Sequence, residues 1–217
     1  MVPMTDLPKE LPLLPLHGAV LMPRCMLPIP LMELPHMSMI AEAKRKNTLI
    51  GLVQPVSVPS RRRKKIKSPL FSIGCAGRVA EITQMEGEGV VALLEGVCRF
   101  DIEKEIDNHA GQRRALVNYD RYLPDLMAEL SQETDRKPLL ASLRRYFSTM
   151  EVDVNWPEVE LASMDHLIHA LTLICPFEAN EKQALLESPS IQERMNLLTA
   201  LCHMGSLETL NKSHHYH

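Results

Sequence analysis

Up to about residue 120, the chain consists of short apolar runs separated by turn-forming segments, a pattern that predicts β-strands. Residues 11–31 predict two short strands that contain prolines. Because proline inside a strand belongs at an edge or a bulge, we expect both strands at the rim of a sheet. Residues 37–47 predict a short helix with cations in its last turn and Asn47 at its end. A buried strand over 49–53 follows.

Three further strand-like runs lie beyond a polar, basic segment. They cover 70–85, 90–95 and 97–104, and the glycine-rich segment 86–89 is typical of a hairpin turn. The third run alternates between apolar and charged positions, so we expect one face in the core and the other in solvent. The core face comprises Cys98, Phe100 and Ile102, and the solvent face Arg99, Asp101 and Glu103. The same alternation returns at Ala115, Val117 and Tyr119.

Beyond Pro124 the apolar period changes to that of α-helices. We expect one helix around 138–150, a second over 163–174 with Ser163 as its N-cap, and a third over 178–187. Ser190 and Glu193 form a capping-box pattern that opens a fourth helix. The pattern therefore predicts an α+β fold: a β-rich module over 8–122, a helical bundle over 123–205 and a disordered tail over 206–217.

The apolar residues of the chain are of an unusual kind, with few aromatics and many methionines and prolines. Aromatic residues make up only 4% of the 217 residues, whereas the chain holds 13 methionines and 16 prolines. Eleven of those prolines precede residue 70, which excludes long helices there.

The five cysteines are dispersed without a Cys-x-x-Cys pair, and we find neither a signal peptide nor an apolar run long enough to span a membrane. These features predict a cytoplasmic protein with reduced thiols.

Motifs for catalysis are missing from the sequence. It contains no Walker loop, no Gly-x-Gly-x-x-Gly fingerprint and no Gly-x-Ser-x-Gly nucleophile elbow, so we expect no catalytic residues. His166 and His169 share one predicted helix, with Cys175 downstream, but a second ligand pair at metal spacing is missing. We therefore expect neither a metal site nor another cofactor.

The strongest local charge signal is a basic segment at 61–67, within a chain whose net charge is −3. Six cations in seven residues would attract phosphate groups or an acidic protein surface. No aromatic residue is interleaved to stack on bases, so an acidic protein partner is at least as well supported as a nucleic acid. The cations are Arg61, Arg62, Arg63, Lys64, Lys65 and Lys67.

Several ordered blocks of the chain resemble the N-terminal, substrate-binding domain of the Lon protease. They are LPLLPLHGAVLMP at 11–23, LFSIGCAGRV at 70–79 and LEGVCRF at 94–100, while 175–189 is similar to the helical half of stand-alone bacterial members of that family. The resemblance implies a small PUA-like β-barrel followed by a helical bundle. It also implies a role in recognising or delivering polypeptide, because the full protease uses this domain to engage substrates.

Two functional hypotheses follow. The first is a non-catalytic module that binds unfolded or exposed apolar polypeptide segments, with a protease or a chaperone as a further partner. Methionine suits a surface that accepts varied partners because it is flexible and polarizable, although methionines also fill aromatic-poor cores. The second hypothesis is a nucleic-acid-binding module that uses the basic segment 61–67. The candidate polypeptide-binding residues are Met22, Met26, Met32, Leu34 and Met37.

Overall fold

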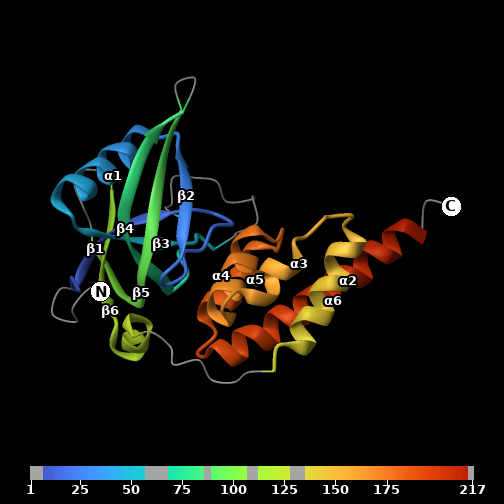
Figure 1. Ribbon diagram of the computed structural model, residues 1–217. Coiled ribbons are helices and arrows are strands. Elements are labelled where there is room, and N and C mark those ends of the chain that lie inside the picture. The colour runs from blue at the N-terminus through green and yellow to red at the C-terminus, as the bar shows by residue number, and fades with distance from the viewer. Residues whose placement is uncertain (1–6, 57–67, 86–88, 107–111, 128–134, 215–217) are drawn as a thin grey trace. The chain divides into compact units, whose positions relative to one another are not determined.

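The computed structural model describes residues 7–56, 68–85, 89–106, 112–127 and 135–214 (Figure 1). The chain divides into two compact units, a β unit over Met1–Glu129 and a helical unit over Leu130–His217. Strands occur in the first and α-helices make up the second, so the predicted α+β class is confirmed. The boundary that we expected at 122/123 lies inside a short 3-10 helix of the β unit, η3 (Asp120–Leu126).

The β unit is built on one sheet in the order β2-β5-β4-β3-β1-β6. Because β5 also pairs with β6, the ladder from β5 through β4, β3, β1 and β6 returns to β5 and closes on itself. Strand β2 lies outside this ring and pairs with β5. All pairings are antiparallel except that of β1 with β3. The strands are β1 (Glu10–Pro15), β2 (Met26–Leu31), β3 (Leu49–Val53), β4 (Ile73–Gln84), β5 (Val90–Ile106) and β6 (Arg113–Asn118).

Strand β5 differs from the two separate strands that the sequence predicts around Gly96. It is one strand of 17 residues, and the predicted hairpin with β4 is confirmed by the pairing of Gln84 with Val90. Gly96 is required for close approach: a Cβ there would overlap the carbonyl oxygen of Met22. The Arg24 N–H donates to the Gly96 carbonyl at 2.8 Å, and the Gly96 N–H donates to the Cys25 carbonyl at 2.9 Å. The glycine therefore joins β5 to a distant loop and does not end a strand.

A single aromatic ring organises the core inside the closed ladder. Phe100 is fully buried on β5, as the alternation predicts. Gly51 and Gly74 on neighbouring strands make room for it, since a Cβ at either position would lie 2.8 or 2.7 Å from the ring. Tyr119 meets Phe100 edge-on with ring centroids 6.2 Å apart. An aromatic-poor sequence thus fills this core with Phe100, flanked by Tyr119, between glycines and aliphatic side chains.

Arg99 does not face solvent, as the alternation predicts, but is only 6% exposed. The helix η3 supplies Asp125, whose carboxylate accepts from Arg99 Nε at 2.9 Å and from Nη2 at 2.8 Å. The same carboxylate accepts from the Arg99 backbone N–H at 3.0 Å, and the guanidinium carbon lies 4.8 Å from the centre of the Tyr122 ring. A bidentate pair of this kind satisfies a charge that would be costly to bury alone.

Helix α1 (Leu34–Lys46) packs against β4, β2 and β3 through the buried side chains of Met39, Ile40 and Ala43. It starts three residues earlier than predicted, with Pro35 in its first turn, where proline needs no N–H partner. Its predicted end at Asn47 is confirmed, because Asn47 adopts the left-handed conformation with φ of 52°.

The helical unit contains five helices in its described residues, α2 (Lys137–Thr149), α3 (Trp156–Leu161), α4 (Met164–Ile174), α5 (Ala179–Glu187) and α6 (Ile191–His214). The predicted caps are confirmed: Ser163 Oγ accepts from the His166 N–H at 3.3 Å, and Ser190 Oγ accepts from the Glu193 N–H at 3.2 Å. The sequence did not predict α3. Ile174, which we expected to face inward, is exposed.

Helix α6 continues to His214, whereas we expected a disordered tail from residue 206. Two small residues let the helix run on through this region. A Cβ at Gly205 would lie 2.6 Å from the Tyr146 ring, and the buried Ser206 hydroxyl donates to the Cys202 carbonyl at 2.8 Å. The composition of the segment indicates solvent exposure, but Gly205, directly before it, lies against Tyr146 of α2.

The two histidines considered as metal ligands have different surroundings. His166 is exposed, whereas His169 is buried with its Nε2 atom 3.1 Å from Arg194 Nη1. Arg194 also donates to the carbonyls of Leu185 and Ser188, which ties α6 to the end of α5. Within the described ranges, no group of three or more His, Cys, Asp or Glu side chains is placed to hold a metal ion.

The five cysteines are all free and buried. Burial raises the pKa of Cys98, Cys175 and Cys202 to about 12 and that of Cys75 well above its usual value. The reactive thiolate is therefore scarce at neutral pH.

We predict no alkylation of the native protein by iodoacetamide at about pH 8, and alkylation of all five cysteines in urea, as measured by mass spectrometry. Rapid native labelling of any of them would contradict this burial.

Candidate functional site

The candidate residues from the sequence fall into three groups in the structure. Met32 and Leu34, at the end of β2 and the start of α1, are 90% and 79% exposed, and Met26 on β2 is 43% exposed. Met37 is half-buried. Met22 is fully buried, because the loop that carries it folds against Gly96 of β5. Met22 is therefore a core residue in this structure and lies out of reach of a partner.

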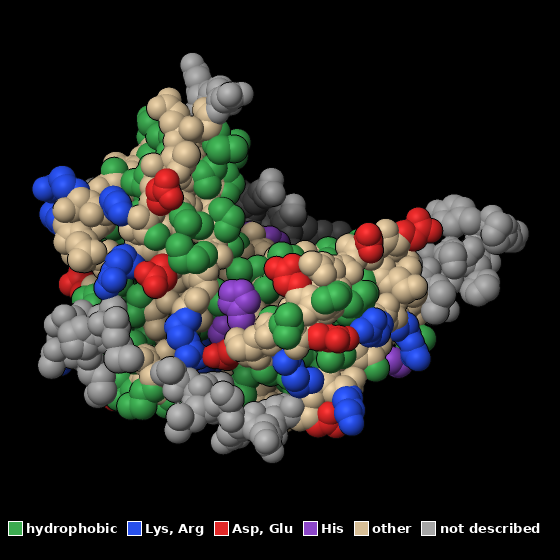
Figure 2. Space-filling model, in the orientation of Figure 1, with side chains coloured by type: hydrophobic (Ala, Val, Ile, Leu, Met, Phe, Trp, Pro, Cys, Tyr) green, Lys and Arg blue, Asp and Glu red, His purple; other side chains and the backbone are tan. Residues whose placement is uncertain are grey.

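The pairing of β2 with β5 places the exposed apolar side chains on one face. Directly paired residues project from the same face of a sheet, and Pro28 pairs with Leu93 while Pro30 pairs with Val91. Met26, Pro28 and Pro30 are exposed, and Val91 and Leu93 are half-buried. We call these five residues the apolar strip. Figure 2 shows hydrophobic side chains gathered over this part of the β unit.

The opposite face of the same strands belongs to the core. Ile29 and Leu31 of β2 and Ala92 and Leu94 of β5 are all buried. The strict alternation means that a slip of one residue between β2 and β5 would bury the strip and expose the core face. The register of this one strand pair therefore decides which apolar residues meet solvent.

Strand β2 is the outer strand of the ladder, yet its free edge is a poor template for another strand. Its described pairing is with β5 alone, and prolines within sheets lie with the nitrogen toward the unpaired side. Pro28 and Pro30 are two residues apart, so both nitrogens face the same edge and remove two hydrogen-bond donors from it. A partner at this position must be held mainly by side-chain contacts on the apolar strip and not by strand addition.

Sequence reasoning missed Pro28, Pro30, Val91 and Leu93 as surface residues. The alternation within 26–31 and within 90–95 is visible in the sequence, but either face could be the buried one. The β2–β5 register resolves this choice, and it joins segments that are far apart in the sequence, with Leu31 paired to Val90 and Met26 to Glu95.

The basic segment 61–67 lies outside the described residues. Its flanks come together at the bridge between Pro55 and Leu70, where the Val56 N–H donates to the Pro69 carbonyl at 2.8 Å. Binding by the six cations of this segment stays a prediction. Of the helices in the described ranges, none is both long and apolar enough to cross a membrane.

A closed β ladder with an apolar outer strand, joined in sequence to a helical unit, defines an α+β class of domain. The family model of the ATP-dependent protease La (LON) substrate-binding domain matches residues 10–203. This chain belongs to that family, as its sequence blocks indicate.

Relatives with curated names are longer proteins. The Lon protease of Syntrophus aciditrophicus is 25% identical over 204 residues, which cover 90% of this chain and 25% of that protein. Lon protease 2 of Myxococcus xanthus is 27% identical over 207 residues, covering 90% of this chain and 24% of that protein. The chain thus spans about a quarter of the length of these relatives.

Solved structures of Lon N-terminal domains share the fold. The Lon N-terminal domain protein from Xanthomonas campestris superposes with a TM-score of 0.60 at 18% identity, covering 88% of this chain and 97% of that one. The N-terminal domain of Mycobacterium avium complex Lon protease gives a TM-score of 0.59 at 15% identity, covering 89% and 98%. At these identities, the likeness concerns the fold alone.

Proposed function

We propose that this chain is a non-catalytic recognition module that binds exposed apolar segments of other polypeptides on the apolar strip, with Met32 and Leu34 extending the contact. The observation that carries the proposal is an outward-facing apolar surface on an outer strand whose own edge is blocked by proline. The family's description as a substrate-binding domain supports a polypeptide ligand.

The side chains of the surface suit ligands of varied sequence. Methionine has three rotatable bonds and a polarizable sulfur, so Met26 and Met32 can adapt to different apolar groups. Pro28 and Pro30 provide a rigid apolar base that loses no side-chain entropy on binding. Such a surface binds through buried apolar area and not through a fixed set of hydrogen bonds.

Recognition without cleavage is part of the proposal. The sequence contains no Walker loop and no nucleophile elbow, and the protease activity in the names of the relatives belongs to proteins about four times as long. We propose that the ligand is a polypeptide awaiting degradation or refolding, and that a protease or chaperone acts on it afterwards in the cytoplasm.

Replacing three exposed residues of this surface tests the proposal. The triple variant Met26→Ser, Met32→Ser, Leu34→Ser is expected to bind fluorescently labelled β-casein, an unfolded polypeptide, about tenfold more weakly, because it removes apolar area that the ligand would bury. Fluorescence anisotropy titration measures the change.

A matched control alters three similarly exposed apolar residues elsewhere, Met127→Ser, Leu161→Ser and Met204→Ser. This control variant is expected to bind casein as the parent chain does. Equal losses in the two triple variants, or no binding of casein by the parent chain, would refute the proposed function.

A further inference from the structure

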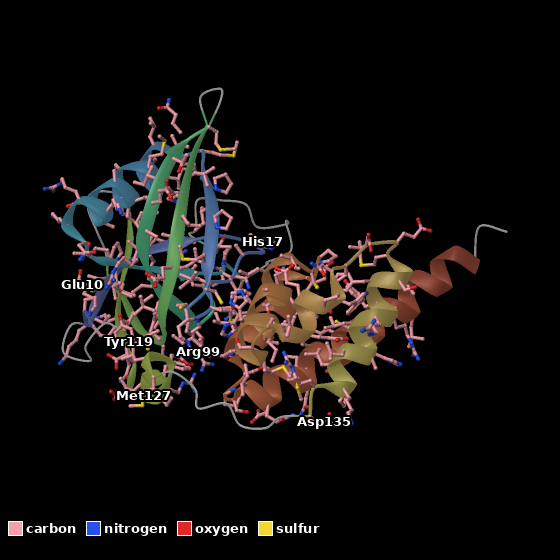
Figure 3. All side chains as sticks on the ribbon, viewed as in Figure 1. Glu10, His17, Arg99, Tyr119, Met127 and Asp135 are labelled. Carbon is pink, nitrogen blue, oxygen red and sulfur yellow. The ribbon has the colours of Figure 1, made fainter. Side chains whose placement is uncertain are left out.

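A second feature of the β unit, separate from the apolar strip, is a pocket of about 440 Å³ beside α1. It is lined by the last turns of α1, the starts of β1 and β3, Arg78 of β4 and Arg114 of β6. Its apolar lining includes Met39, Ala43 and Leu49. Figure 3 labels Glu10, which lines the pocket from the start of β1.

Two of the three cations in the pocket are already neutralised. Arg114 Nε lies 2.5 Å from a carboxylate oxygen of Glu10, and Lys46 Nζ lies 2.6 Å from one of Glu42. The hydrogen bond from Lys46 lowers the pKa of Glu42, so that carboxylate is charged at neutral pH. Arg78 therefore carries the one unbalanced charge of the pocket lining.

The guanidinium of Arg78 has no acceptor among the described residues. Its Nε atom is buried and makes no hydrogen bond there, and no ion pair to its side chain is found in the same ranges. Arg136, the other arginine with an unsatisfied Nε, differs because its terminal nitrogens donate to the carbonyls of Glu160 and Ala162. A buried donor without an acceptor is costly, so the Arg78 environment favours binding of an anionic oxygen.

The pocket fits a singly charged anion better than a phosphate dianion. One unbalanced guanidinium can pair bidentately with a carboxylate, whose two oxygens match its geometry. The carboxyl end of α1 borders the pocket through Lys46 and Asn47, and the helix dipole places partial negative charge there. This field disfavours a second negative charge on the ligand. The apolar lining accepts a hydrocarbon group next to the single charge.

We propose that this pocket binds a carboxylate that carries an apolar group, with Arg78 as its charge partner. The C-terminal residue of a polypeptide and a free acylated amino acid both have this chemistry. The inference does not rest on the function proposed above, because the pocket and the apolar strip have no residue in common.

Isothermal titration with four probes separates the sources of the carboxylate. They are a short peptide ending in leucine with a free carboxylate, the same peptide amidated, N-acetyl-leucine and inorganic phosphate. Binding of the free peptide but not of the amide supports the proposal and assigns a polypeptide C-terminus; additional binding of N-acetyl-leucine supports it and assigns the small molecule. Equal binding of the amide, tighter binding of phosphate, or no binding of either carboxylate would overturn it.

Two substitutions test the role of Arg78. Arg78→Gln is expected to weaken carboxylate binding about tenfold or more, because it removes a charge-assisted bidentate contact. Glu42→Gln is expected to strengthen carboxylate binding, because it leaves Lys46 as a second unbalanced cation.

Two control variants should bind the carboxylate as the parent does. One is Arg121→Gln, at an exposed arginine outside the pocket, and the other is the Met26/Met32/Leu34 triple variant. Unchanged binding by Arg78→Gln, with circular dichroism showing a folded chain, would overturn the assignment.

Discussion

Gly96→Ala is expected to lower the free energy of unfolding of the β unit by about 3 kcal/mol or more, at the upper end of overpacking effects. The added Cβ would overlap the carbonyl oxygen of Met22, which is backbone and cannot rotate away. The loop cannot withdraw without breaking the hydrogen bonds that Arg24 and Cys25 make with the Gly96 backbone. Urea denaturation, monitored by the alkylation of the buried Cys98, measures the effect within the β unit. Tryptophan fluorescence would not report on this unit, because the only tryptophan, Trp156, lies in the helical unit.

Gly89→Ala is the matched control for this substitution. A Cβ at Gly89 would meet Met85 at 3.7 Å, an ordinary contact, so the urea midpoint should hardly change. If Gly96→Ala were as stable as Gly89→Ala, the close approach of the 22–25 loop to β5 would be wrong.

Asp125→Ala is expected to cost about 3–5 kcal/mol, the usual result of leaving a buried charge without its partner. The substitution removes the acceptor for the Arg99 guanidinium and for the Arg99 backbone N–H together. Figure 3 labels Arg99 in the β unit, where η3 and β5 meet. The same Cys98 alkylation assay in urea reports the loss, because the Cys98 thiol donates to the Tyr122 carbonyl of η3 at 3.3 Å.

Two further variants separate charge burial from packing. Arg99→Met combined with Asp125→Leu should recover much of the loss, because an apolar pair needs no desolvated charge. Lys46→Ala, which breaks an exposed ion pair on α1, should cost no more than about 0.5 kcal/mol. An Asp125→Ala variant as stable as Lys46→Ala would show that the Arg99–Asp125 pair is solvated and not buried.

Helix ends and the β4–β5 hairpin could be predicted from the sequence, because residues close to one another in the chain determine them. Ser163 and Ser190 are followed by the helices that their capping patterns indicate, and Asn47 ends α1 in the left-handed conformation. Each of these signals operates within a few residues, so distant contacts do not alter it. The hairpin between β4 and β5 is predictable for the same reason.

Features that depend on distant contacts could not be predicted. From the sequence alone, Gly96 indicates a break between two strands, because the close approach of the loop at Met22 is not visible there. Arg99 is predicted to face solvent, because its partner Asp125 lies 26 residues later in the chain. The methionines near the rim have similar local sequence, yet Met22 is buried and Met32 exposed. Only the pairing of β2 with β5 distinguishes the apolar strip from the core.

Methyl NMR of the 13 methionines, labelled with carbon-13, shows directly which of their side chains meet an unfolded polypeptide. On addition of unfolded β-casein, we expect shifts or broadening of the Met26 and Met32 signals. The buried methionines Met22, Met39 and Met195 should keep their positions, as should the exposed Met127 and Met204. Perturbation of Met127 or Met204 with Met26 and Met32 unchanged would place polypeptide binding elsewhere on the chain and contradict the proposed function.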